Sequence, residues 1–198
     1  MKKKILVTLI AIVAAFVGLG VLIGIIAIPY SISSYNGLLK SQANVEESWS
    51  NVEVYMQRRA DLIPNLVNTV KGYTDYEQGT LTAVTEARNA FAKANSVNEQ
   101  VEASNQLESA LDIWVNAVTE SYPELKANEQ FTALTDELSG SENRIATARK
   151  DYNSSAKEYN VEIKKFPKVI IANLFGFESF EYFEAQAGAE KAPQVNFD

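Results

Sequence analysis

Apolar residues are concentrated at the start of the chain. The 24 residues from Ile5 to Ile28 contain no charged side chain, and nearly all of them are apolar. A helix rises about 1.5 Å per residue, so about 20 such residues are enough to cross the hydrocarbon core of a bilayer. The pattern therefore predicts a membrane-spanning helix over residues 5–28, preceded by a short basic segment at residues 1–4.

A cleaved signal peptide is the alternative interpretation of this run, because Lys2, Lys3 and Lys4 resemble the basic start of such a peptide. The apolar region of a signal peptide is usually only about 7 to 15 residues long, and residues 27–30 make a poor cleavage site. We therefore expect the helix to remain as an anchor. The next basic residue is Lys40, so the positive-inside rule places the N-terminus in the cytoplasm and the rest of the chain outside.

Beyond Tyr30 the apolar positions recur at helical spacing, in steps of three, four and seven residues. The first such series is Leu38, Val45, Trp49, Val52 and Met56. It predicts a helix from about Ser31 to the Arg58-Arg59 pair. A break near Ala60 is expected there, because Asp61 can cap a new helix that carries Pro64 in its first turn.

Three further series predict three further helices. One runs from Ile63 to Phe91, and the next runs from Val97 to Val118 and ends before Pro123, where Ser121 and Glu124 resemble a capping box. The last and longest is expected from about Asn128 to Pro167. It contains Gly140, and its buried positions include Tyr152, Tyr159 and Phe166.

Together these elements predict an all-α protein, in which the N-terminal transmembrane helix is followed by an antiparallel four-helix bundle over residues 30–166. Residues 167–187 form an apolar and aromatic segment without a clean helical period. It is expected to dock, either as a flap that closes one end of the bundle or as a contact for a partner. Residues 188–198 are expected to be a flexible tail.

Charge and composition exclude several classes of function. The part beyond the anchor has 15 basic and 25 acidic residues, a formal charge of −10, which argues against nucleic acid as a partner. The chain has no Cys and no His, so it has no disulfides, no zinc site built on those ligands and no Cys or His catalysis. A di-iron site in a helical bundle needs Glu-x-x-His motifs. We expect no cofactor.

A longer motif follows the predicted break. Residues 58–67 read RRADLIPNLV, and residues 70–73 read VKGY. They resemble the RRxDLIPNLV and VKGY motifs of the LemA family almost letter for letter. Shorter similar pieces follow in the same order, among them Tyr122-Pro123-Glu124-Leu125-Lys126-Ala127-Asn128, Glu142-Asn143-Arg144-Ile145, Tyr152-Asn153, Tyr159-Asn160 and Phe166-Pro167. The resemblance covers about residues 30 to 183.

The resemblance implies a membrane-anchored bacterial protein with a helical-bundle domain, which agrees with the fold expected from periodicity. It implies no defined biochemical activity and no catalytic residues. The chain departs from the family at residues 74–77, where relatives often carry a His before the Glu. A role that depends on that His is therefore not transferred.

The family motif is the first candidate site, as a recognition patch for an acidic or peptide partner. Its residues are Arg58, Arg59, Asp61, Pro64, Asn65, Lys71, Gly72 and Tyr73. The alternative is structural, because an Asp at a helix N-terminus and arginines at the end of the preceding helix are favoured by local electrostatics.

A polar network between helices is the second candidate site. Its residues are Glu77, Arg88, Glu142, Asn143, Arg144 and Arg149. Buried charges must be paired, so the network either forms a binding pocket or fixes the register of the helices. A third feature is the Tyr-Asn pair repeated seven residues apart at 152–153 and 159–160, either core packing or an aromatic stripe for a ligand.

The sequence therefore favours a non-enzymatic interaction or scaffold module of a bacterial cell envelope. Its expected partners are the lipid bilayer, through residues 5–28, and unidentified envelope proteins. Self-association is a further expectation, because Gly20 and Gly24 form a GxxxG spacing. The alternatives are an accessory or sensory subunit of an envelope stress or proteolysis system, and a hydrolase that uses carboxylates.

Overall fold

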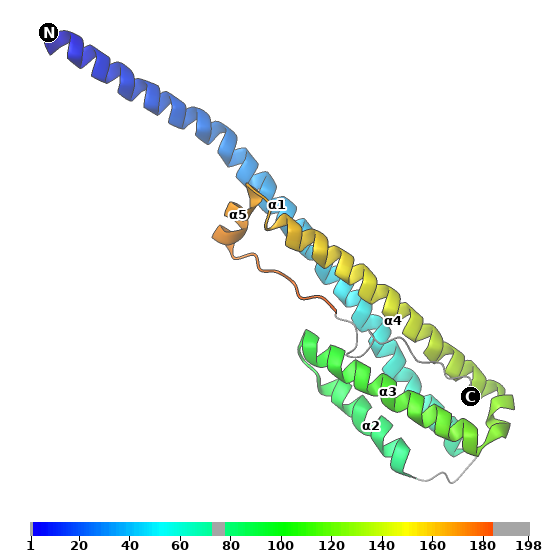
Figure 1. Cartoon of the computed structure of the whole chain (residues 1–198). Coiled ribbons are helices and arrows are strands. Elements are labelled where there is room, and N and C mark those ends of the chain that lie inside the picture. Colours follow the sequence, from blue (N-terminus) through cyan, green and yellow to red (C-terminus); the bar gives the residue numbers. More distant parts are fainter. Residues whose placement is uncertain (1, 73–77, 184–198) are drawn as a thin grey trace, which may run out of the picture. The chain divides into compact units, whose positions relative to one another are not determined.

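The computed structural model describes residues 2–72 and 78–183, and their regular structure is entirely helical (Figure 1). The elements are α1 (Lys2–Lys71), α2 (Gln78–Lys93), α3 (Val97–Ser121), the 3-10 helix η1 (Pro123–Ala127), α4 (Glu129–Glu162) and α5 (Lys168–Phe175). The prediction of an all-α chain with a long apolar N-terminal helix and packed helices after it is confirmed. The expected flexible tail at 188–198 lies outside the described residues.

The apolar run occupies the first part of α1. Its large side chains are exposed from Ile12 to Ile28, with fractions between 51% and 71%. The helix is long and apolar enough to cross a membrane, and none of its most apolar stretch is buried within the protein. These features indicate a membrane anchor.

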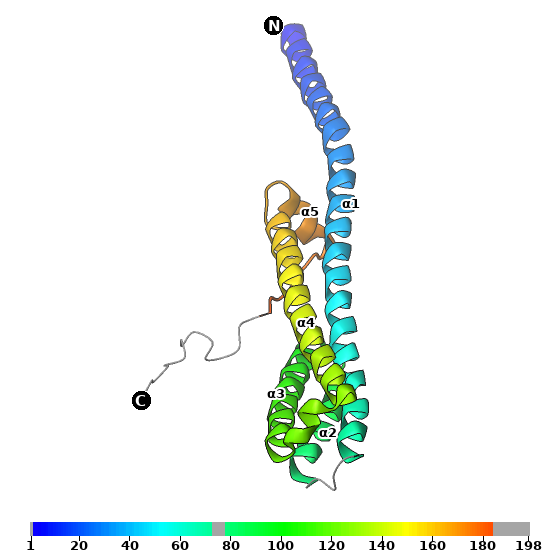
Figure 2. The same cartoon turned by 90° about the vertical axis from the view of Figure 1, so that its right-hand side faces the viewer.

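The chain divides into two compact units, to which α1 and α4 both contribute. Unit 1 contains the described residues up to Ser48 and those from Asp151 onward. In it, the part of α1 after Tyr30 packs beside the end of α4, and α5 lies against α1 (Figure 2). The core of unit 1 is formed by Leu38, Val45, Tyr152, Ala156, Tyr159, Ile163, Ile171 and Ala172.

Unit 2 contains residues 49–150, and its core surrounds Trp114 of α3, which is 1% exposed. The short connection between α2 and α3 makes them antiparallel neighbours. A capping box starts α3, since the Ser96 hydroxyl accepts from the Glu99 amide and the Glu99 carboxylate accepts from the Ser96 amide. The capping box expected at Ser121 is wrong. Tyr122 precedes η1 without a side-chain cap, and Pro123 starts that helix.

The expected break near Ala60 is also wrong, because α1 continues without interruption to Lys71. Asp61 is therefore not a cap. The reason is the buried face of the helix, which passes through the break position with residues three or four apart: Met56, Ala60, Ile63, Leu66 and Val70 are each at most 3% exposed. Ending the helix at residue 60 would remove Ile63, Leu66 and Val70 from this buried face.

Pro64 is consequently in the interior of a helix, where it supplies no N–H to the carbonyl of Ala60 four residues earlier. Arg88 of α2 replaces this missing donor. Its Nε donates to the Ala60 carbonyl oxygen at 3.2 Å. A tertiary contact thus satisfies the backbone group that proline leaves without its helical partner.

The end of α4 differs from the expectation as well. The helix stops at Glu162, five residues before Pro167, and the turn that follows leaves Phe166 82% exposed instead of buried. Pro167 then precedes α5, so the first part of the docking segment is helical. α5 ends at Gly176, whose left-handed conformation (φ 73°) suits a residue without Cβ.

The contact between Arg88 and Ala60 predicts a coupling with Pro64. In the wild type, Arg88→Ala leaves a buried carbonyl without this donor and is expected to lower the free energy of unfolding by about 1–3 kcal/mol. In a Pro64→Ala background, the amide of residue 64 can donate to that carbonyl, and the same substitution is expected to cost less. Denaturant unfolding of the detergent-solubilised chain, followed by tryptophan fluorescence, measures both costs. Equal costs in the two backgrounds would show that the compensation does not exist.

Candidate functional site

The second arginine of the family motif, Arg59, is buried. It is 3% exposed and reaches from α1 to α3 within unit 2. Its NH2 group donates to both the carbonyl oxygen and the hydroxyl of Ser104 at 2.6 Å, and its NH1 group lies 3.2 Å from the Glu108 carboxylate. A buried charge that loses its partner is strongly destabilising, so Arg59 and its partners hold α1 against α3.

Arg149 of α4 is a second basic group directed at α3. Its NH2 group donates to Asn105 Oδ1 at 2.9 Å. Burial lowers the pKa of Arg149; the nearby Glu108 carboxylate opposes this effect, and the positive charge of Arg59 adds to it. Glu108 therefore pairs with Arg59 and lies close enough to Arg149 to influence its pKa.

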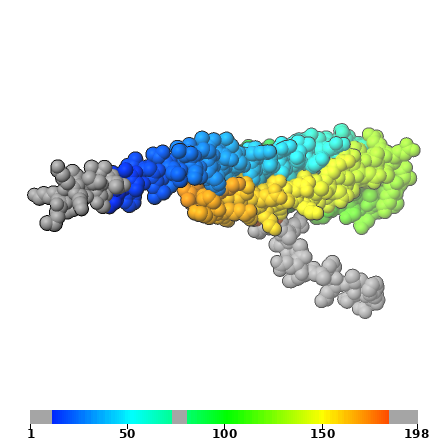
Figure 3. Space-filling view, turned by 90° about the horizontal axis from the view of Figure 1, so that it is seen from above, coloured from blue at the N-terminus to red at the C-terminus, as the bar shows by residue number. Residues whose placement is uncertain are grey.

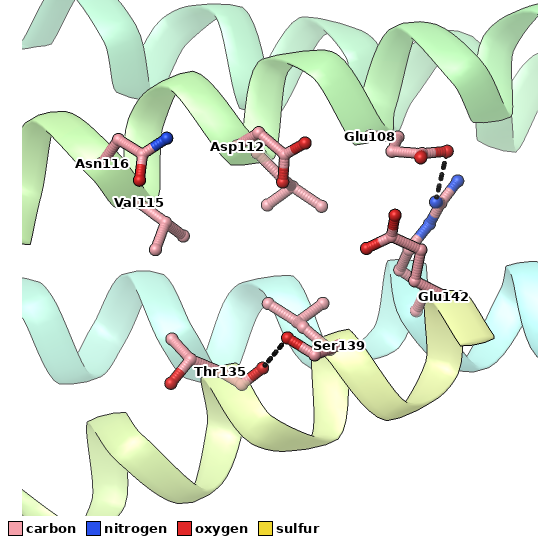
Figure 4. A pocket seen from close by; sticks show the side chains of 10 residues that line it. Glu108, Asp112, Val115, Asn116, Thr135, Ser139 and Glu142 are labelled. Atoms are coloured by element: carbon pink, nitrogen blue, oxygen red, sulfur yellow. Dashed lines mark hydrogen bonds and ion pairs between the residues drawn. The ribbon is translucent and has the colours of Figure 1, made fainter. Parts of the chain in front are cut away.

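A small pocket opens beside this cluster, between α3 and α4 (Figure 4). Its volume is about 110 Å³, and Arg59 and Glu108 contribute to its wall together with Asp112 and Glu142. Apolar contacts come from Leu111, Val115 and Leu138. The pocket thus combines three carboxylates with one buried guanidinium.

Two of these carboxylates have raised pKa values. For Asp112 the largest cause is burial, and the charge of Glu108 adds to it. For Glu142 burial also raises the pKa most, and the carboxylates of Glu108 and Asp112 add to it. In both cases Arg59 acts in the opposite direction. The pocket can therefore take up a proton more readily than ordinary carboxylates do.

The exposed residues of the family motif lie elsewhere in unit 2, along an open groove of about 740 Å³. Arg58, Asp61 and Asn65 are spaced at helical intervals on α1 and share this groove. Its other lining residues are Ser50, Glu53, Val54, Met56, Gln57 and Leu62 of α1, Phe91 of α2 and Gln100 of the start of α3. The continuous helix places the motif residues on one face.

Arg58 also forms an ion pair with Glu137 of α4, 2.7 Å away, and Arg144 approaches the same carboxylate at 3.1 Å. Asp61 accepts from Gln57 Nε2 at 2.8 Å. Lys71 and Gly72 are exposed at the end of α1. Tyr73 and Glu77 lie outside the described residues.

The predicted polar network is only partly assembled. Glu142 and Arg149 both lie beside Arg59 and Glu108, whereas Arg88 is engaged with the Ala60 carbonyl. Asn143 and Arg144 are exposed, so they are not part of a buried network. Glu108 and Asp112 were not among the site residues predicted from the sequence. Their spacing of four residues, beside the buried Leu107 and Leu111, was the available signal.

The repeated Tyr-Asn pairs of α4 bind the extended segment that follows α5 in unit 1. Asn160 donates to the Phe180 carbonyl at 2.8 Å and accepts from the Phe180 amide at 2.9 Å. Asn153 pairs with the carbonyl and amide of Phe183 in the same way, at 3.0 and 2.9 Å. The two phenylalanine rings pack edge-on against Tyr159 and Tyr152, and the Tyr152 hydroxyl donates to the Glu181 carbonyl.

The hydrogen bonds of Asn153 and Asn160 predict that mutating these two asparagines will loosen residues 180–183. Replacing both by Ala removes two hydrogen bonds from each of Phe180 and Phe183, each worth about 1 kcal/mol. Hydrogen exchange at these two backbone amides should become several-fold faster, as measured by mass spectrometry or NMR. The control is Asn143→Ala, an exposed position of the same helix. Unchanged exchange in the double variant would show that Asn153 and Asn160 do not hold this segment.

The raised pKa values predict a pH-dependent effect at the pocket. A folded-state pKa above the unfolded one gives stability that is complete when the carboxyl is protonated and is lost as pH rises through the folded-state value. Glu142→Gln mimics the protonated form. Its melting temperature should therefore match the wild type at about pH 3.5, below the ordinary pKa of Glu, and exceed it at neutral pH.

The control for this prediction is Glu86→Gln, which removes the same charge at an exposed position of α2 outside the pocket. Thermal unfolding of the three proteins across this pH range gives the comparison. A gain at neutral pH that is equal in both variants would reflect net charge alone and would contradict a specific effect of the pocket.

Comparison with known proteins places these features in a family. The sequence matches the model of the LemA family over residues 48–197. Magnetosome proteins MamQ 1 and MamQ 2 of Paramagnetospirillum magneticum are each 28% identical to it over 181 residues, which cover 79% of this chain and 66% of theirs. Protein LemA of Metamycoplasma hominis is 25% identical over 151 residues, 76% of this chain and 68% of that protein.

The chain spans about two thirds of the length of these curated relatives. The family match includes the buried arginine, the groove lined by the motif and both Tyr-Asn pairs, and it covers well over half of the sequence. The protein belongs to the LemA family.

Proposed function

We propose that this chain is a non-enzymatic interaction module of a bacterial cell envelope, attached by a single transmembrane helix over residues 5–28. By the positive-inside rule its N-terminus is cytoplasmic and its helical domain extracytoplasmic. The groove lined by Arg58, Asp61 and Asn65 is the observation that carries the proposal, because it places the exposed part of the family motif on one open surface.

The composition of the groove suits a peptide segment of another protein. Val54 is 59% exposed and Leu62 half-buried, so they offer apolar contacts, while the groove also carries the charges of Glu53, Arg58 and Asp61. Apolar anchors surrounded by polar groups are characteristic of surfaces that bind a partner's helix or extended segment. The expected partner is an envelope protein that presents an amphipathic segment.

A carboxylate hydrolase is the competing function, because the pocket at Glu142 has carboxyls of raised pKa. Its volume of about 110 Å³ is small compared with the roughly 300–1,000 Å³ of typical ligand sites. Arg59 and Glu108 are also committed to holding helices together. These observations favour binding at the groove over catalysis at the pocket.

A sensory subunit of an envelope stress or proteolysis system is the second candidate. It is supported by the same carboxylates, whose raised pKa values predict that the stability of unit 2 falls as pH rises. In that case the pocket would act through the stability of the domain, and the groove would remain the contact surface. The interaction module and the sensory subunit would therefore both bind a partner at the groove.

Site-specific photocrosslinking in cells tests the proposal. A photoreactive amino acid at Val54, in the groove, is expected to capture a reproducible partner identified by mass spectrometry. The control position is Ile113 of α3, which is comparably exposed at 63% and lies outside the groove. The Val54 crosslink should be lost in an Arg58→Ala/Asn65→Ala variant and retained in Glu142→Gln. Arg59 is left intact because it is buried.

Identical products from Val54 and Ile113, or a Val54 product that survives the double substitution, would contradict a specific site at the groove. Circular dichroism must show that the double variant keeps its helical content. Loss of the crosslink in Glu142→Gln with the groove intact would instead assign the function to the pocket.

A further inference from the structure

The short helix α5 has an apolar face that unit 1 does not cover. Ile171 and Ala172 point into the core, with exposed fractions of 8% and 1%. Ile170 and Leu174, one helical turn apart, are 56% and 72% exposed. Phe166, in the turn before α5, adds a side chain that is 82% exposed. Three large apolar groups are thus presented to the surroundings within nine residues.

α5 lies next to the stretch of α1 that directly follows the anchor. The ring of Phe175 at the end of α5 is 4.7 Å from the ring of Tyr35 on α1, and Phe177 packs against Tyr35 at 5.7 Å. Of α4, α5 and the turn that joins them, the turn lies closest to the apolar run of α1 (Figure 2). α5 is also at the surface beside α1 in Figure 3.

The spacing along α1 places this contact at the edge of a bilayer. Tyr35 follows Ile28 by seven residues, about 10 Å of helix. The headgroup layer on each side of the hydrocarbon core is roughly 5–8 Å thick. The sequence remains uncharged up to Leu39, and Tyr30 and Ile32 are exposed at 41% and 58%. The spanning segment can therefore extend past Ile28, which brings α5 to the headgroup layer.

Basic residues accompany this face, although the domain is acidic as a whole. Lys164 and Lys165 are exposed immediately before Phe166. Lys168 begins α5 and lies 2.8 Å from Glu162. Lysines beside apolar side chains are typical of helices that lie in the membrane interface, where the amines meet lipid phosphates and the apolar groups enter the acyl boundary.

We propose that α5 and the turn before it form a second membrane contact, an interfacial helix that inserts Phe166, Ile170 and Leu174 into a phospholipid bilayer beside the anchor. The inference rests on the proposed attachment through residues 5–28. The anchor and α5 together would fix the rotation of unit 1 about the axis of α1. A transmembrane helix alone leaves this rotation free. The lysines of this contact come more than 130 residues after the anchor, beyond the flanking segments that decide topology.

Spin labelling tests this contact in the full-length protein, which has no native cysteine. Single cysteines are introduced at Ile170 and at Leu174, and the labelled chain is placed in nanodiscs of phosphatidylcholine and phosphatidylglycerol. Two control labels define the scale: Phe16 in the anchor for the bilayer, and Glu158, exposed on α4, for water. Power saturation then compares the accessibility of each label to oxygen, which concentrates in lipid, and to a water-soluble nickel complex.

The labels at Ile170 and Leu174 are expected to resemble the one at Phe16, with an oxygen-to-nickel accessibility ratio several-fold above that at Glu158. A ratio equal to that at Glu158, with a lipid-like Phe16, overturns the contact of α5 and leaves the anchor intact. Low accessibility to both reagents means that protein, such as a second copy, covers the face, and this also overturns the proposal. An aqueous label at Phe16 rejects the anchor and the inference together.

Discussion

The continuity of α1 is the constraint on which the other features of this protein depend. One helix carries the anchor, part of the core of unit 1 and a buried face in unit 2. A proline inside a helix costs about 3 kcal/mol, and Pro64 lies within the family motif. Burial of Ile63 and Leu66 offsets this cost, because each fully buried side chain contributes about 1.5–3 kcal/mol. Arg88 then satisfies the carbonyl that lost its backbone donor.

The continuous helix places the two arginines of the motif in different surroundings. On a continuous helix, neighbouring positions point about 100° apart, so Arg58 faces the groove while Arg59 enters the core. Arg59 needs Glu108 and Ser104 as partners. Burial raises the pKa of nearby Asp112 and Glu142, and the carboxylate of Glu108 adds to this effect. The buried guanidinium thus brings Glu108 to the pocket, where its charge adds to the effect of burial on the two neighbouring carboxyls.

The sequence predicted those parts of the fold that depend on periodicity. The series from Leu38 to Met56 is buried as expected, apart from the half-buried Trp49, and α3 begins at Val97. The prediction of a helix break at residue 60 was wrong. The local preferences of Asp and Pro favour a break there, whereas the contacts that keep the helix continuous come from α2 and from the core. Of the candidate site, the motif was found, but the separate roles of Arg58 and Arg59 required the geometry of the continuous helix.

The partner of the Tyr-Asn repeat was predictable in principle from two spacings. Seven residues of helix span about 10.5 Å, and three residues of extended chain span about 10 Å. Asn153 and Asn160 are seven apart, while Phe180 and Phe183 are three apart. The two periods therefore match, and each asparagine meets the backbone of one phenylalanine when the segment runs antiparallel to α4. The agreement is not seen when the asparagine spacing is considered only within the helix and the phenylalanine spacing only within the extended segment.

This match also explains the exposed face of α5. An isolated helix of eight residues is unstable in water, so α5 depends on contacts at both of its ends. The turn from α4 holds its start, and the segment fixed by Asn153 and Asn160 holds its end. Within these limits Ile171 and Ala172 fill the core, which leaves Ile170 and Leu174 directed outward beside α1. This arrangement leaves Ile170 and Leu174 available to a surface outside the domain.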